Sequence, residues 1–139
     1  MNLHDLLVAQ ITANGPMRIS DFMADCLLHP DFGYYTTKNP FGASGDFVTA
    51  PEVSQMFGEL IGLSLAQAWI DQGSPTSFAL VEFGPGRGTL MADILRATKG
   101  VSGFHQAAQI TLLEASAKLR ARQGETLQGY TPIWIEAAD

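Results

Sequence analysis

Apolar residues recur at helical spacing in two short stretches at the start of the chain. The first stretch covers residues 2–14 and ends before Pro16, because a proline cannot continue a helix. The second begins at Ser20, whose side chain suits the N-cap, and stops before Pro30. The amino-terminal part of the chain is therefore predicted to be helical.

A stretch without a period separates these helices from a longer one. Residues 31–50 are rich in glycine, proline and aromatic side chains, and we predict an ordered loop there, because linkers seldom hold so many aromatic groups. Helical spacing of apolar positions resumes at Pro51, which suits a first helical turn, and continues to about Asp71. Gly73 lies beyond the end, so one continuous helix is expected.

From residue 78 onward, short apolar runs alternate with amphipathic segments. The runs at Phe78–Phe83, 110–113 and 133–135 predict strands, and the segments at 89–99 and 116–127 predict helices. Crossovers of this kind are right-handed and join parallel strands. We therefore predict a parallel sheet with the strands in the order 3-2-1.

These elements predict an α/β fold class in two parts. Residues 1–73 form a helical and loop region, and residues 74–139 form the first half (β-α-β-α-β) of a Rossmann-like domain. A complete open sheet of order 3-2-1-4-5 has its first strand at the centre. Here that strand becomes an edge with unpaired N–H and C=O groups. We expect a truncated domain, or one that a partner or oligomerisation completes.

The clearest motif is a glycine-rich loop between the first predicted strand and the next helix. Gly84, Gly86 and Gly88 alternate with other residues, and glycine lets the backbone approach a ligand closely. A dinucleotide-binding loop requires Gly-x-Gly-x-x-Gly, but Thr89 occupies the place of the last glycine. The predicted cofactor-binding residues of this segment are Gly84, Pro85, Gly86, Gly88, Thr89 and Leu90.

Two acidic residues add to the predicted site. Glu82 precedes the loop, where a carboxylate would repel a pyrophosphate but can accept from the cationic amino end of a methionine moiety or from a water. Glu114 closes the second strand, where a carboxylate can accept both hydroxyls of an adenosine ribose. Its distance from the first glycine fits an extended loop at residues 99–109.

Charge and composition limit the kinds of molecule and environment that suit this chain. The formal net charge of −6 makes nucleic acid a poor partner and slightly favours a basic protein substrate. The one cysteine, Cys26, cannot form an internal disulfide, which fits a reducing cytoplasm. No histidine clusters with acids or Cys26 at metal-ligand spacing, so we expect no metal. No stretch approaches the roughly 18 apolar residues that a membrane span needs.

Several segments of the chain match one known family as a set: 31–35, 40–42, 45–54, 57–59, 82–90, 93–96, 114–116, 119–120 and 123. By these segments the chain resembles the MidA family of class I methyltransferases. The resemblance implies S-adenosyl-L-methionine as the cofactor. For mitochondrial members it further implies symmetric dimethylation of an arginine on a subunit of respiratory complex I, linked to assembly of that complex. Family members are more than twice this long, so the resemblance supports cofactor binding more than turnover.

The catalytic residue is not identified, but Asp46 and Glu52 are candidates. Thr49 and Glu52 fit a capping box at a helix start. In a functional alternative, Asp46 or Glu52 lies near the methyl-transfer site and orients a guanidinium through a bidentate pair. Both interpretations stay open at this point.

Three hypotheses follow for function. The leading one is a methyltransferase fragment, in which the sulfonium methyl moves in one in-line displacement to a nitrogen, with a protein arginine as the implied acceptor. The second is a non-catalytic assembly or binding module that uses the incomplete fold. The third is a nucleotide-dependent oxidoreductase, which the glycine spacing disfavours.

Overall fold

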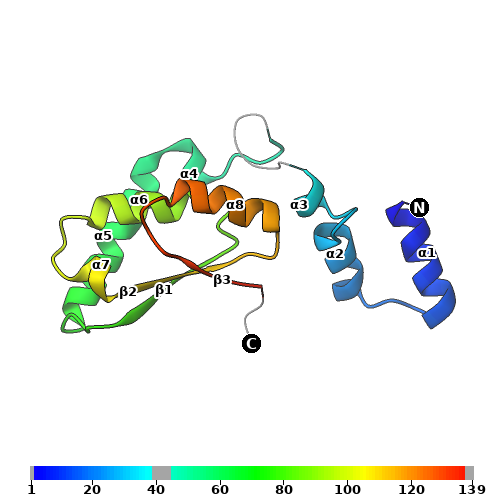
Figure 1. The fold of residues 1–139 in the computed structure, drawn as a ribbon, viewed down its shortest axis with the longest axis horizontal. Coiled ribbons are helices and arrows are strands. Elements are labelled where there is room, and N and C mark those ends of the chain that lie inside the picture. Colours follow the sequence, from blue (N-terminus) through cyan, green and yellow to red (C-terminus); the bar gives the residue numbers. More distant parts are fainter. Residues whose placement is uncertain (1, 39–44, 137–139) are drawn as a thin grey trace. The chain divides into compact units, whose positions relative to one another are not determined.

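The computed structural model describes residues 2–38 and 45–136, which fall into two compact units that divide after residue 40 (Figure 1). The sequence placed the domain boundary at residues 73 and 74. The structure instead groups residues 45–73 with the sheet, because helix α5 (Gln55–Asp71) packs along helix α6 (Thr89–Thr98).

The first unit holds helices α1 (Leu3–Asn14) and α2 (Ile19–Leu28). Helix α1 is confirmed where the apolar spacing predicted it. Asn2 and Asp5 cap its amino-terminal end with a reciprocal capping box. The prediction of Ser20 as the N-cap of α2 is wrong. Arg18 is the N-cap, and Ser20 lies inside the first turn, where its hydroxyl donates to the neighbouring Asp21.

A short helix, α3 (Tyr34–Thr37), interrupts the segment that was predicted as a loop. The hydroxyls of Thr36 and Thr37 both donate to the Gly33 carbonyl, at 2.9 and 2.7 Å. The same carbonyl also accepts the backbone N–H of Thr37 at 3.1 Å, which closes the single helical turn. The rest of the predicted loop includes residues 39–44, which lie outside the described residues.

The second unit begins with two helices where one continuous helix was predicted. Helix α4 (Ala50–Val53) is separated from α5 by Ser54, whose backbone is extended at φ −153° and ψ 127°. The Ser54 hydroxyl accepts from the Met56 N–H at 3.2 Å and so caps α5. The apolar spacing continues through this break, so periodicity could not reveal it.

The parallel sheet is confirmed in the predicted order. Strands β1 (Phe78–Phe83), β2 (Ala108–Leu113) and β3 (Ile133–Ile135) are parallel neighbours in the order β1-β2-β3. Helix α6 connects β1 toward β2, and helix α8 (Ala117–Thr126) connects β2 to β3. The predicted extended loop at 99–109 contains a further short helix, α7 (Phe104–Ala107).

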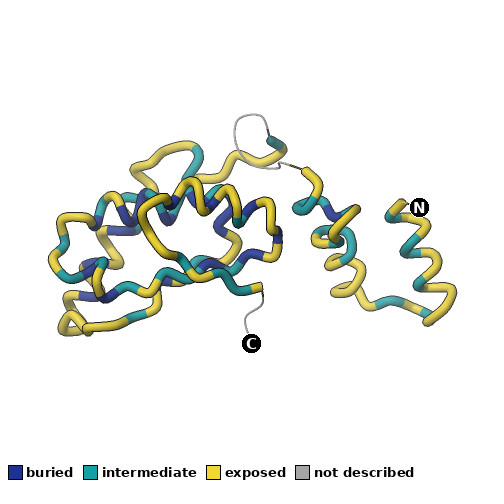
Figure 2. The backbone as a smooth tube through the Cα atoms, viewed as in Figure 1, coloured by how far each residue is buried: buried dark blue, intermediate teal, exposed yellow. Residues whose placement is uncertain are grey.

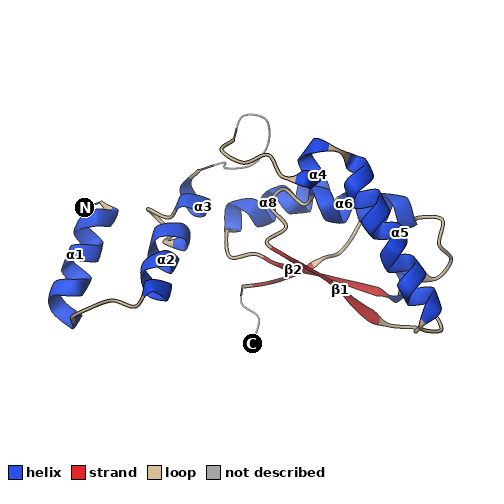
Figure 3. Ribbon diagram, turned by 180° about the vertical axis from the view of Figure 1, so that it is seen from behind, coloured by secondary structure: helices blue, strands red, loops and turns tan. Residues whose placement is uncertain are grey.

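Helices α5, α6 and α8 lie on one side of this sheet (Figures 1 and 3). Strand residues alternate accordingly: Leu80 and Leu112 face the helices and are buried, whereas Val81 and Phe83 are 43% and 67% exposed. Figure 2 shows the buried backbone where helices and strands meet. The core on this side consists of Leu80, Met91, Ile94, Leu95, Leu112 and Leu127.

Two glycines let α5 approach α6 closely. A Cβ atom added at Gly58 would lie 2.5 Å from the Asp93 Cβ, and one added at Gly62 would lie 2.9 Å from the Ile94 Cα. Near the end of α5, Trp69 packs edge-on against Phe104 in a second buried cluster. Trp69 itself is buried and belongs to the core.

Candidate functional site

The glycine loop joins the carboxyl end of β1 to the start of α6. Gly84, Gly86 and Gly88 all have left-handed backbone, with φ of +60°, +55° and +80°. Side-chain-bearing residues rarely adopt this conformation, so the alternating glycines are required for the path of the loop. The Gly84 N–H donates to the Leu113 carbonyl at 3.0 Å, which anchors the loop to the end of β2.

Glu82 lies on the helix-facing side of β1, just before this loop. Its Oε2 atom is buried and has no hydrogen-bond partner among the residues that the structure describes. Burial raises the pKa of this carboxyl from 4.5 to about 7, and a hydrogen bond with the Met91 backbone opposes part of the rise. A buried acceptor without a partner is uncommon in folded proteins, so this atom fits a donor that a ligand or water supplies.

Glu114 follows the end of β2 and is buried, with 6% of its surface exposed. Its Oε1 accepts from the Ser116 N–H at 2.8 Å, and its Oε2 accepts from the Gln123 Nε2 at 3.2 Å. Each carboxylate oxygen has two acceptor positions, so these bonds leave capacity for ribose hydroxyls. The side chain is held in one orientation before any ligand binds.

Glu52 reaches the glycine loop from helix α4. Its Oε1 accepts from the Thr89 hydroxyl at 2.7 Å, and its Oε2 pairs with the Arg87 guanidinium at 3.3 Å. The capping-box interpretation is therefore wrong: Thr49 is the N-cap of α4, but its side chain makes no capping hydrogen bond. Glu52 is drawn instead to the two donors of the loop.

The remaining predicted residues lie as follows. Pro85 is buried within the loop, and Leu90 is half-buried in the first turn of α6. Asp46 is exposed in the segment before α4, and its candidate role stays a prediction. The structure thus gathers the loop, Glu114 and Glu52 at the carboxyl ends of the strands, where open α/β sheets bind ligands.

Sequence reasoning missed the residue that connects these groups. Gln123 of α8 is fully buried, and its Nε2 donates both to the Gly86 carbonyl and to Glu114. A signal was present: Gln123 lies four residues from both Leu119 and Leu127, which places it on the buried face of the helix. A polar residue at such a position needs polar partners.

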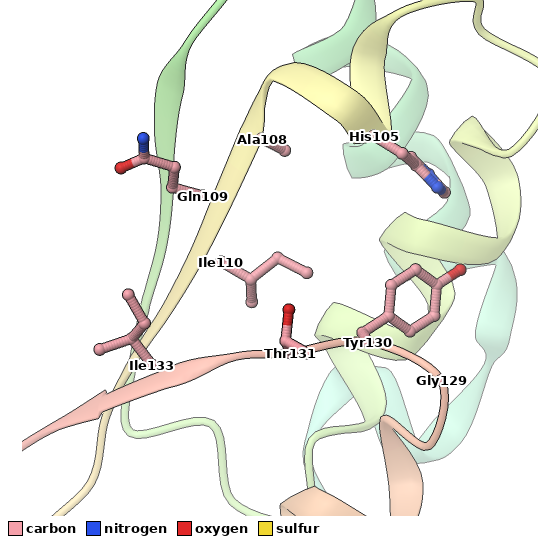
Figure 4. Close-up of a pocket in the computed structure, with 8 residues that line it drawn as sticks. All are labelled: His105, Ala108, Gln109, Ile110, Gly129, Tyr130, Thr131 and Ile133. Atoms are coloured by element: carbon pink, nitrogen blue, oxygen red, sulfur yellow. The ribbon is translucent and has the colours of Figure 1, made fainter.

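A hollow of about 360 Å³ lies at the opposite end of the sheet (Figure 4). Ala108 and Ile133 begin strands β2 and β3, and His105 and Tyr130 face one another across the space. Because the glycine loop lies at the carboxyl ends of the strands, this hollow is separate from the predicted site. Its lining residues are His105, Ala108, Gln109, Ile110, Gly129, Tyr130, Thr131 and Ile133.

Two properties of the described residues, 2–38 and 45–136, bear on other kinds of site. They contain no group of three or more His, Cys, Asp or Glu side chains arranged to hold a metal ion. Within the same ranges, no helix has the length and apolar character needed to cross a membrane.

The fold and the loop define an α/β protein of the Rossmann-like methyltransferase class. The chain belongs to the family described as "Putative S-adenosyl-L-methionine-dependent methyltransferase", whose model matches residues 60–139. This membership confirms the resemblance to the MidA family that the sequence motifs indicated.

Curated relatives extend the match into the amino-terminal region. The mitochondrial protein arginine methyltransferase NDUFAF7 of Danio rerio is 44% identical over 126 residues, covering 88% of this chain and 30% of the relative. The human (Homo sapiens) protein of the same name is 42% identical over 123 residues, covering 87% of this chain and 28% of the relative. The chain thus spans about 30% of the length of the curated relatives it matches.

A solved structure covers almost the whole chain. It is a crystal structure of a Burkholderia thailandensis protein described as a "likely methyl transferase" and bound to S-adenosyl-homocysteine. The TM-score is 0.79 and the sequence identity 32%, over 99% of this chain and 37% of that one. The predicted fold class is therefore confirmed by a relative that holds the demethylated form of the predicted cofactor.

Proposed function

We propose that this chain forms the S-adenosylmethionine-binding part of a protein arginine methyltransferase. The observation that carries the proposal is the glycine loop, in which three left-handed glycines leave β1 beside a buried oxygen of Glu82 that has no partner within residues 2–38 and 45–136. The Burkholderia thailandensis protein, which is similar over 99% of this chain, is bound to S-adenosyl-homocysteine and supports the same ligand class here.

Each residue of the site has a role that fits this ligand. The open side of Gly84, where an added Cβ would meet no atom within 4 Å, lets the ligand approach the backbone. Glu82 would accept from the amino group of the methionine end, and Glu114 from the ribose hydroxyls. Bound S-adenosylmethionine would supply an electrophilic methyl group, and Pro85, Gly86, Gly88, Thr89 and Leu90 would shape the pocket around it.

An arginine-bearing protein is the proposed methyl acceptor of the complete family member. The curated relatives are named protein arginine methyltransferases, and the net charge of −6 suits a basic substrate. The MidA resemblance adds the link to respiratory complex I assembly.

The two candidate catalytic residues differ in what they contact. Because both Glu52 oxygens already accept from Thr89 and Arg87, we assign Glu52 to positioning the loop. Asp46 is then the remaining candidate for orienting a guanidinium.

A cytoplasmic location, which the single cysteine favours, stays a prediction. The curated relatives are named as mitochondrial.

The test is calorimetric titration of the chain with S-adenosyl-homocysteine, repeated on Gly84→Ala and Gly129→Ala. Both glycines have positive φ, +60° and +95°, and an added Cβ at either meets nothing within 4 Å. Both variants therefore place a side chain at positive φ without a steric clash, but only Gly84 lies in the glycine loop. We expect saturable binding by the wild-type chain, at least about tenfold weaker binding by Gly84→Ala, and unchanged binding by Gly129→Ala.

Two outcomes would contradict the proposal. A folded wild-type chain that shows no saturable heat with S-adenosyl-homocysteine would remove the cofactor site from these residues. Equal weakening by both variants would mean that backbone strain, rather than the glycine loop, controls binding. A parallel titration with NAD tests the oxidoreductase alternative, for which we expect no binding.

A second candidate function is an assembly module that holds a partner without catalysis. The observation that favours it is the apolar surface left on β1, where Val81 and Phe83 are 43% and 67% exposed. This candidate predicts partner binding that survives Gly84→Ala, whereas the enzyme proposal predicts loss of function in that variant.

A further inference from the structure

Gln123 is a fully buried amide whose nitrogen and oxygen both make hydrogen bonds. Its Nε2 donates to the Gly86 carbonyl at 2.8 Å and to the Glu114 Oε2 at 3.2 Å, and its Oε1 accepts from the Trp134 indole at 2.8 Å. The side chain thus connects the glycine loop, the end of β2 and strand β3 from a position on α8. Such a network is costly to break, because each group it leaves behind stays buried.

The partners of Gln123 permit only one orientation of its amide. The Trp134 indole nitrogen is a donor only, so it must face the amide oxygen. The Gly86 carbonyl and the Glu114 carboxylate are acceptors, so both must face the amide nitrogen. A flipped amide would place like groups together at all three contacts. The bonds of Gln123 therefore impose a fixed geometry on the groups around it.

Two of these groups belong to opposite parts of the predicted ligand site. Gly86 is in the loop that follows Glu82, the acid assigned to the amino group at the methionine end, and Glu114 is the acid assigned to the ribose. The C=O and N–H of a trans peptide point in opposite directions, and the described peptides are all trans. Because Gln123 holds the Gly86 carbonyl, it directs the Arg87 N–H away from α8. Gly88 adds a packing contact, since a Cβ atom added there would lie 3.5 Å from the Gln123 Cα.

We propose that Gln123 is a positioning residue that fixes the glycine loop relative to Glu114 and thereby sets the affinity for the adenosyl ligand. This inference rests on the proposed function, because it requires the ligand to contact both groups. Gln123 acts through Gly86 and Glu114 and need not touch the ligand itself.

The experiment compares S-adenosyl-homocysteine titrations of the full chain for Gln123→Met, Gln123→Glu and Trp134→Phe. Gln123→Met keeps the apolar stem but removes both donors, so we expect at least about tenfold weaker binding. Trp134→Phe removes only the bond to Oε1 and leaves both Nε2 bonds, so binding should stay within about threefold of wild type. If Gln123 were only a core residue, the two variants would lower affinity in proportion to their loss of thermal stability, measured by circular dichroism.

Gln123→Glu gives a pH-dependent readout that packing alone would not produce. At pH 8 the new carboxylate would face the Glu114 carboxylate and the Gly86 carbonyl, and repulsion should weaken binding. The neighbouring charged group on α8 is Arg120, whose guanidinium donates to the Glu114 carbonyl and to Glu136. At pH 5.5 a protonated side chain of the variant has one O–H, so it can restore one of the two bonds that the amide nitrogen donates. The ratio of variant to wild-type dissociation constants should therefore fall by at least about threefold from pH 8 to pH 5.5.

The outcomes separate this inference from the proposed function. Binding by the wild-type chain together with unchanged affinity in Gln123→Met would overturn the inference alone. If Gln123→Met does not fold, a folded Gln123→Glu variant with a pH-independent ratio overturns it instead. Absence of binding by the folded wild-type chain would overturn both.

Discussion

Glu82 is a residue of the predicted site that lowers the stability of the folded chain when its carboxyl is ionised. Its carboxyl is buried with one oxygen unpartnered among the described residues, and this burial raises its pKa to about 7. A functional site often holds such a group, because a ligand supplies the missing partner. Glu82 is therefore a residue whose role should be visible in stability as well as in binding.

The stability of the chain should fall as the pH rises from about 4.5 to about 7. In this window the folded state retains a proton on Glu82 that the unfolded state has released, so ionisation favours unfolding. The full effect of the shift is on the order of 3 kcal/mol. Glu82→Gln should remove this part of the pH dependence and be more stable than wild type at pH 8, as measured by urea unfolding at pH 5 and pH 8.

An exposed acid provides the control for that measurement. Glu125 lies on the surface of α8 and pairs with Arg122 three residues away. Glu125→Gln should show the same difference in the free energy of unfolding between pH 5 and pH 8 as the wild-type chain. If Glu82→Gln does the same, the burial of Glu82 has no energetic consequence and the structural argument for a ligand partner there is lost.

At the site, residue-level prediction succeeded where backbone conformation decides and failed where a distant partner decides. The glycine positions follow from backbone conformation, and all three loop glycines have the positive φ that the motif required. A local capping box was one of two interpretations of Glu52, but its carboxylate instead accepts from Thr89, which lies 37 residues away. The contacts of Gln123 likewise join parts of the chain that only the tertiary fold brings together.

At the scale of elements, the contact between α5 and α6 depends on glycines in a helix. Gly62 lies so close to α6 that an added Cβ would stand 2.9 Å from the Ile94 Cα and 3.0 Å from its carbonyl oxygen. These are backbone atoms, which cannot move aside as a flexible side chain can. Glycine weakens an isolated helix, so its presence here reflects packing.

Gly62→Ala should destabilise the chain even though alanine is the better helix former. The clash is expected to cost about 1–3 kcal/mol, which exceeds the roughly 1 kcal/mol gained in helix propensity. Gly124→Ala in α8 is the matched control, because its Cβ would meet only Trp134, at an ordinary 3.9 Å. That variant should be as stable as wild type or slightly more stable in urea unfolding. An unchanged urea-unfolding midpoint for Gly62→Ala would show that α5 and α6 can move apart without loss of stability.

Element types were predicted well, and element boundaries less well. The strands and the two helices between them follow from short apolar runs and amphipathic segments, and they are confirmed. The break at Ser54 was missed because hydrophobic periodicity continues across it. The short helix α7 was missed because four residues are too few for a period to show.

At the scale of the whole molecule, the sheet has an open edge and an uncovered apolar face among the described residues. Strand β1 pairs with β2 on one side, and Val81 and Phe83, which alternate with the buried Leu80, are exposed on the face opposite the helices. The continuous apolar run of β1 predicts cover on both faces, as in parallel sheets generally. This chain supplies cover on one face only within residues 45–136.

The chain should therefore associate with itself or with a partner through β1. Sedimentation velocity at increasing protein concentration is expected to show association, and Val81→Lys should shift the distribution toward monomer by placing a charge on the apolar face. Ile19→Lys introduces the same charge on the exposed surface of α2 and should have little effect. A wild-type chain that stays monomeric and stable at all concentrations would contradict the proposal.

The hydrogen bond between Trp134 and Gln123 also makes the chain its own optical probe. The chain has two tryptophans, and Trp69 lies in the aromatic cluster with its indole bonded to the Pro75 carbonyl. Trp134 instead lies one hydrogen bond from the residue that holds the glycine loop. Indole emission responds to the polarity and hydrogen bonding around the ring. Rearrangement of the loop would thus be transmitted to a natural fluorophore, and ligand entry could be followed in real time without a dye or a label.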